Sequence, residues 1–97
     1  MKPVIFTTLT IQPHLVDAAV ELLRKVQSDV RANEPGTLFY QFNQRADDPT
    51  IIWAHEVFAD EAAKRAHLDR LLSNEELQTN LAALNAAPPV MVLATEL

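Results

Sequence analysis

The stretch Ile51–Leu68, IIWAHEVFADEAAKRAHL, decides the fold of this chain. It begins as an apolar strand, continues through Asp60, which can cap a helix, and ends in an alanine-rich helix. Glu56 lies near the end of the strand, and His67 lies on the apolar side of the helix with Leu71. Because the helix starts only four residues after Glu56, it must fold back over the sheet. We therefore expect Glu56 and His67 to be coupled, directly or through one water.

Regular patterns continue on both sides of this unit. The apolar positions from Leu15 to Val30 recur at helical spacing and predict the most secure helix, which should stop before Pro35-Gly36. Pro13 suits its first turn. The predicted strands are 4–11, 37–45, 50–58 and 90–97, with a hairpin turn at 46–49.

The second helical region is predicted to be interrupted. Ser73 with Glu76 three residues later has the pattern of a capping box, so a new helix should begin there after a kink near Leu72. Pro88-Pro89 is expected to end this helix, since proline cannot continue one.

The element order is thus β-α-β-β-α-α-β, which predicts an α+β, ferredoxin-like split fold. Four antiparallel strands would carry the helices on one face. However, the strands are apolar on both faces: Tyr40 and Phe42, for example, alternate with Phe39. If the second face stayed uncovered, it would expose a larger apolar patch than monomers tolerate, so we expect a homodimer that covers it.

Composition bounds the class of protein. The 97 residues include 48% hydrophobic ones, which suits one compact domain spanning residues 1–97. The net charge is −5 and the eight basic residues are scattered, so neither nucleic acid nor an anionic membrane is expected as a partner. No apolar run approaches the roughly 20 residues that span a bilayer. The absence of Cys excludes disulfides and is compatible with a cytoplasmic protein.

Read as a whole, the chain resembles the antibiotic biosynthesis monooxygenase superfamily. Its members read strand, Glu, aromatic, Asp or Glu, short helix and His, as Ile51–Leu68 does. Glu34-Pro35-Gly36-Thr37 followed by LFYQF looks like the family's turn into its second strand, and Asp48-Pro49 looks like its next hairpin. The resemblance covers about the whole length. It implies a dimeric α+β barrel with a pocket between sheet and helices.

Three residues are the candidates for chemistry. His67 is the candidate base, because imidazole exchanges protons near neutral pH, and Glu56 would orient it. Tyr40 could donate a hydrogen bond to a phenolic oxyanion. The alternatives are structural: a His67 bonded to a backbone carbonyl, a Glu56 that bridges to another element or to the second protomer, and a Tyr40 packed in the core.

The resemblance makes aromatic side chains candidate pocket walls for a flat ligand. The expected ligand-binding residues are Trp53, His55, Phe42 and Leu71. Trp53 and His55 lie on the strand face opposite Glu56, and an apolar dimer interface or core would use Trp53 equally well.

The leading hypothesis is a cofactor-independent oxygenase that acts with O2 on a quinol, anthrone or other phenolic substrate. We expect no flavin, haem or metal. The histidines lack ligand spacing, and Gly36 is the only glycine, so there is no glycine-rich loop to hold a nucleotide phosphate. The resemblance implies that haem-degrading relatives use an Asn on the first strand, whereas this chain has only Thr7, Thr8 and Thr10 there. Two alternatives remain: an isomerase of the same fold, and a dimeric binding or stress-response protein without catalysis.

Overall fold

The computed structural model describes residues 1–97 and has the expected order of elements. The strands are β1 (Pro3–Ile11), β2 (Thr37–Gln44), β3 (Ile51–Phe58) and β4 (Asn85–Thr95). The helices are α1 (Val16–Asn33), α2 (Glu61–Ser73) and α3 (Glu75–Leu84), with a 3-10 turn at Pro13–Leu15 before α1. No helix is both long and apolar enough to cross a membrane.

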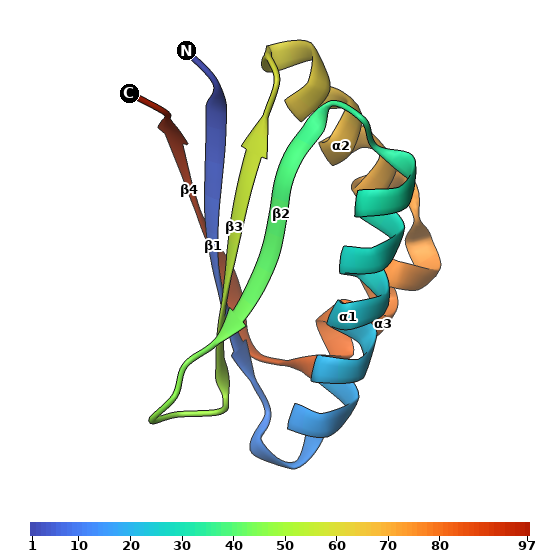
Figure 1. Ribbon diagram of the computed structural model, residues 1–97. Helices are drawn as coiled ribbons and strands as arrows, with labels where there is room; N and C mark the ends of the chain where they lie inside the picture. Colours follow the sequence, from blue (N-terminus) through green and yellow to red (C-terminus); the bar gives the residue numbers. More distant parts are fainter.

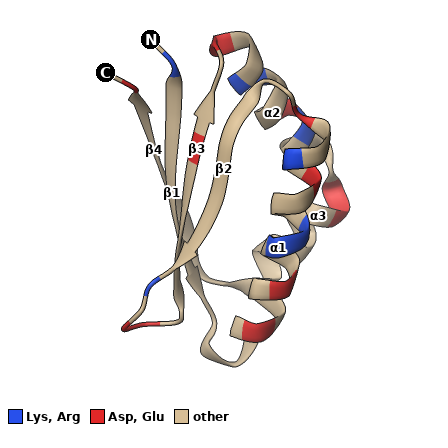
Figure 2. Cartoon of the chain, viewed as in Figure 1, with Lys and Arg blue, Asp and Glu red and all other residues tan.

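The four strands form one antiparallel sheet in the order β2-β3-β1-β4, and all three helices lie on one face of it (Figure 1). This is the predicted ferredoxin-like α+β fold. Charged residues gather on the helices and turns, whereas the strands are almost free of them (Figure 2). Glu56 is the single Asp, Glu, Lys or Arg in the four strands. The sheet is therefore an apolar layer with one charge built into it.

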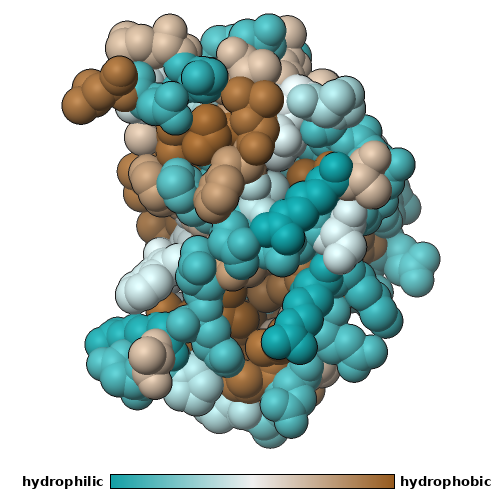
Figure 3. Space-filling view, in the orientation of Figure 1, coloured by the Kyte–Doolittle hydropathy of each residue, from teal (hydrophilic) through white to brown (hydrophobic).

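Helix α1 holds the centre of the core. Its buried residues, Ala19, Leu23, Val26 and Val30, follow the predicted helical spacing. They pack against Ile11 and Ile52 at one end and against Tyr40 at the other. Apolar side chains are also visible between α1 and β2, beneath longer hydrophilic ones (Figure 3). The apolar stripe thus fixes the face of α1 that turns to the sheet.

The break between α2 and α3 lies one residue later than predicted. Asp60 caps α2 as expected, because its Oδ1 accepts from the Ala63 N–H at 2.8 Å. The cap of α3, however, is Asn74, whose Oδ1 accepts from the Leu77 N–H at 3.1 Å. The expected Ser73 cap was wrong. Ser73 is the last residue of α2, and the neighbouring Asn74, a comparably good capping residue, takes the role.

The last strand also begins earlier than predicted. Pro88-Pro89 was expected to end the helix, but α3 ends at Leu84 and both prolines lie inside β4. Proline lacks the N–H that a central strand needs, so it is restricted to edge strands and bulges. Strand β4 is an edge strand, and its pairing with β1 shifts between Thr8 and Thr10. The prolines are accommodated there for this reason.

Gly36 lies where β2 begins beneath the first turn of α2. Its φ is not positive, so backbone conformation does not demand glycine there. A Cβ on Gly36 would stand 2.8 Å from the Cβ of Ala63. The Ala59 N–H also donates to the Gly36 carbonyl at 2.9 Å. Close contact between this turn and α2, which carries His67, therefore requires a residue without a side chain.

Gly36→Ala should lower the free energy of unfolding by about 1–3 kcal/mol, because overpacking forces the turn away from α2. Chemical denaturation measures this loss. In the double variant Gly36→Ala/Ala63→Gly, the space returns, and part of the stability should return despite the glycine in a helix. Equal stability of wild type and Gly36→Ala would contradict the role of this contact.

Candidate functional site

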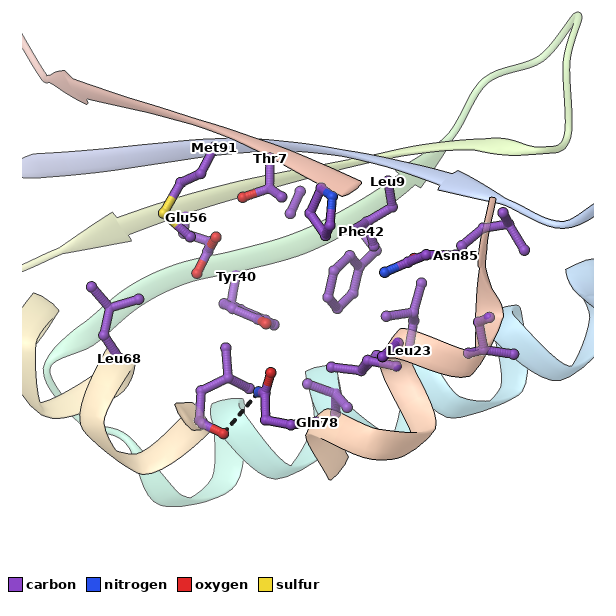
Figure 4. A pocket seen from close by; sticks show the side chains of 18 residues that line it. Thr7, Leu9, Leu23, Tyr40, Phe42, Glu56, Leu68, Gln78, Asn85 and Met91 are labelled. Atoms are coloured by element: carbon purple, nitrogen blue, oxygen red, sulfur yellow. Dashed lines mark hydrogen bonds between the residues drawn. The ribbon is translucent and has the colours of Figure 1, made fainter. Parts of the chain in front are cut away.

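A cavity of about 250 Å³ lies between the sheet and the helices (Figure 4). All four strands and all three helices contribute to its wall, which is mostly apolar. The polar side chains that line it are few: Thr7, Tyr40, Glu56, Gln78 and Asn85. An apolar cavity with a few polar groups is typical of a binding site for a small molecule.

Glu56 brings the charge into this cavity from β3. It pairs with Ile5 on one side and Tyr40 on the other, so it faces the helices with Ala54. Glu56 is 5% exposed, and its carboxylate points toward the cavity (Figure 4). A carboxylate in such surroundings requires a partner, because removing it from water is unfavourable.

The partner is His67 on α2, as the sequence predicted. Its Nε2 lies 3.0 Å from Glu56 Oε1, although the contact is not aligned as a hydrogen bond. Its Nδ1 lies 2.6 Å from Glu34 Oε1 and makes a short, aligned bond. His67 is only 1% exposed and is not part of the cavity wall. The imidazole therefore sits behind Glu56, between two carboxylates.

The ionic contacts continue from His67 to the surface. Glu34 Oε2 accepts from Arg70 Nη1 at 2.9 Å, and Arg70 Nη2 donates to Asp29 Oδ1 at 3.0 Å. Glu34, Arg70 and Asp29 line a separate hollow of about 260 Å³ between α1 and α2. One chain of side-chain contacts thus leads from the cavity through His67 to the opposite side of the helix layer.

The surroundings of His67 favour its charged form. Burial lowers the pKa of His67, but the adjacent carboxylates of Glu56 and Glu34 outweigh burial and raise the pKa above its ordinary value. For Glu34, burial raises the pKa, while bonds from Thr37, His67 and Arg70 together lower it below the usual range. We infer that the His67 ring is an imidazolium near neutral pH, with a carboxylate at each nitrogen.

Tyr40 lies beside this pair and keeps its proton. Burial, followed by the charges of Glu56 and Glu34, raises the pKa of its hydroxyl. Its ring packs against His67 and Phe42 at centroid distances of 5.3 Å. Arg31 holds the strand here, because its Nε donates to the Tyr40 carbonyl at 3.1 Å. The hydroxyl is therefore a neutral hydrogen-bond donor on the cavity wall.

The expected wall residues divide between the two faces of the sheet. Phe42 and Leu71 line the cavity with Tyr40 and Glu56. Trp53 and His55 lie on the helix-free face and do not contact the cavity. There the His55 ring stacks on Phe6 at a centroid distance of 4.8 Å. The side-chain alternation of β3 separates these two residues from Glu56.

Sequence reasoning missed several polar residues of the site. Glu34 was noticed only as part of the Glu-Pro-Gly turn, and Arg70 was not considered. Their signal was one of spacing, since Arg70 follows His67 by three residues and shares its helix face. Gln78 and Asn85 carried no local signal, because only the packing of α3 and β4 against the sheet brings them to the cavity.

Residues 4–72 match the antibiotic biosynthesis monooxygenase family, and the chain belongs to it. The matched part includes the Glu34 turn, Glu56 and His67. No match is found among curated proteins. The family defines the class of protein, while the individual activity depends on the site.

Solved structures share the fold over nearly the whole chain. A proposed antibiotic biosynthesis monooxygenase from Nitrosomonas europaea is 23% identical, with a TM-score of 0.83 and coverage of 98% of each chain. One from Caulobacter crescentus is 20% identical, with a TM-score of 0.86 and coverage of 99% of this chain and 90% of its own. A protein of unknown function from Nitrosomonas europaea is 26% identical, with a TM-score of 0.80 and coverage of 99% and 93%.

NMR titration of the His67 ring should give a pKa above about 6.5, the ordinary value for histidine. Glu34→Gln and Glu56→Gln should each lower that pKa, because each removes a negative charge beside the imidazolium. Glu75→Gln, which removes a carboxylate at an exposed position of α3, is the control and should leave the pKa of His67 unchanged. An unchanged His67 pKa in both variants would show that the carboxylates do not charge the ring.

The same coupling links stability to pH. The pKa of His67 is higher in the folded protein than in the unfolded chain. The charged ring therefore adds to the free energy of unfolding below about pH 6.5, and this stabilisation is lost as the pH rises through the folded pKa. Denaturation curves of wild-type protein should show this loss, and those of Glu56→Gln should show less of it.

Proposed function

We propose that the protein is a cofactor-independent monooxygenase whose cavity binds a flat phenolic, quinol or anthrone-type molecule. The observation that carries this proposal is one carboxylate, Glu56, in an apolar cavity, with the buried His67 ring 3.0 Å behind it. Deprotonating such a substrate makes it rich enough in electrons to react with O2 itself. The protein must supply a proton acceptor, a donor to the oxyanion and a cavity that excludes water.

The geometry favours roles for Glu56 and His67 that are the reverse of those the sequence suggested. Glu56 faces the cavity and would accept the substrate proton, while His67 would balance its charge from behind. Tyr40 would donate to the substrate oxyanion.

The oxygen step balances without a further reductant. In an anthrone-type substrate, deprotonation places electron density on the ring carbon of the CH2 group. This carbon forms a bond to one oxygen of O2, and the resulting hydroperoxide loses water to leave a carbonyl. The two hydrogens of the CH2 group and the second oxygen atom leave together as H2O.

An oxygen electrode with a panel of quinols and anthrones tests this proposal. Glu56→Gln should lower kcat on the order of a hundredfold or more, because it removes the proton acceptor. His67→Ala and His67→Gln should also lose activity. Glu75→Gln and His14→Ala, at exposed positions, are the matched controls. Proton exchange of the substrate without oxygen uptake would favour an isomerase, and binding without either would favour a non-catalytic protein.

We also propose that the protein is a homodimer that pairs through the helix-free face of the sheet. Large apolar side chains are about half exposed on this face: Phe6, Phe39, Trp53, Val90 and Val92. An apolar patch of this kind is uncommon on monomers, and a two-fold copy of the same patch is its simplest cover. His55 would then be an interface residue, together with Trp53.

Val92→Asp should dissociate the dimer and lower stability together, since the charge would enter an apolar contact. Val92 pairs with Phe6 on the helix-free face, whereas the neighbouring Met91 lines the cavity. Light scattering at micromolar concentration measures the mass. Thr79→Asp, on the exposed side of α3, is the control. A wild-type protein that is folded and monomeric under these conditions would rule the interface out.

A further inference from the structure

The end of the cavity remote from Glu56 has polar groups that the proposed proton transfer does not use. Asn85, at the junction of α3 and β4, points its amide into the cavity, and Tyr40 and Phe42 lie between it and Glu56 (Figure 4). Gln12 Nε2 donates to the Asn85 backbone carbonyl at 3.5 Å, and the Asn85 backbone N–H donates to the Ala82 carbonyl. The Asn85 side-chain amide makes no hydrogen bond within the protein and is free to bind a ligand in a mostly apolar wall.

Gln78 on α3 adds a second polar group with a fixed orientation. Its Nε2 donates to the Leu71 carbonyl at 3.0 Å, so its Oε1 is left as an acceptor. This bond crosses the break between α2 and α3 and holds the amide in place at the cavity wall. Half-buried polar groups without a protein partner are normally satisfied by water or by a ligand.

The strand register separates the two ends of the cavity. Glu56 pairs with Ile5 and Asn85 pairs with Ile11, six positions farther along β1. At about 3.3 Å per residue, their backbones are roughly 20 Å apart, and both side chains extend into the cavity between them (Figure 4). The gap therefore suits an elongated molecule with polar groups at opposite ends better than a single small ring.

We propose that Asn85 is a specificity residue that binds a carbonyl oxygen at the end of the substrate opposite to the hydroxyl held by Glu56. This inference rests on the proposed function and narrows its substrate class to flat hydroxyaryl ketones. The Asn85 amide N–H groups donate to the carbonyl, and the ring system lies against Phe42 and Tyr40. An analogue without the carbonyl would leave the amide unpaired and bind less tightly.

Two naphthol probes test this inference: 6-acetyl-2-naphthol, with hydroxyl and carbonyl at opposite ends, and 6-ethyl-2-naphthol, which has the same ring system and lacks the carbonyl oxygen. Calorimetry should show that wild-type protein binds the acetyl compound about tenfold more tightly. Asn85→Leu, of similar volume, should abolish this preference. Asn85→Asp should weaken binding of the acetyl compound, because a carboxylate offers only acceptors to its carbonyl oxygen. Asn80→Asp adds the same charge on the exposed side of α3 and should bind like wild type.

The readouts separate failure of this inference from failure of the proposed function. Equal binding of both probes by wild type, or a preference that survives in Asn85→Leu, would overturn the role of Asn85. It would not contradict the proposed phenol-binding site at Glu56. Binding of neither probe would overturn both. A shift of the Asn85 side-chain amide signal in NMR with the acetyl compound, and not with the ethyl compound, is the expected support. Thermal unfolding of each variant verifies that it is folded.

Discussion

The contact between His67 and its two carboxylates is the interaction on which the rest of the site depends. An imidazole that is 1% exposed would normally be neutral, because burial disfavours charge. Glu34 on one side and Glu56 on the other reverse this preference. The three groups also join the end of α1, the end of β3 and the middle of α2. One charged cluster thereby fixes the helix layer over the sheet and sets the charge at the cavity.

The arrangement reconciles a buried charge with an apolar sheet. Glu56 is the single charged residue of the strands. The free-energy cost of removing its carboxylate from water is offset by the contact with His67. Glu34 in turn is held by Thr37 and Arg70, so the cluster extends to the surface. Removing one member would leave the others uncompensated. The cluster therefore behaves as a unit, and its stability and its chemistry share one cause.

The two faces of the sheet serve different purposes. The face toward the helices forms the core and the cavity, and the outer face carries a stacked pair, Phe6 and His55, with Trp53 nearby on the same strand. Aromatic residues at adjacent positions of one strand, such as Phe39 and Tyr40 on β2, thus have different surroundings. A list of aromatic residues from the sequence cannot tell a cavity wall from an interface, since the assignment depends on which face the helices cover.

The sequence by itself determined the element order, the helical stripe of α1, the Asp60 cap and the placing of Glu56 and His67 within reach of each other. These features are local: they follow from periodicity, capping and a connection too short to allow another path. Tertiary structure alone decided the rest. It brought Glu34 to His67 from 33 residues away and Asn85 to the far end of the cavity. It also admitted prolines to β4, because only pairing made that strand an edge.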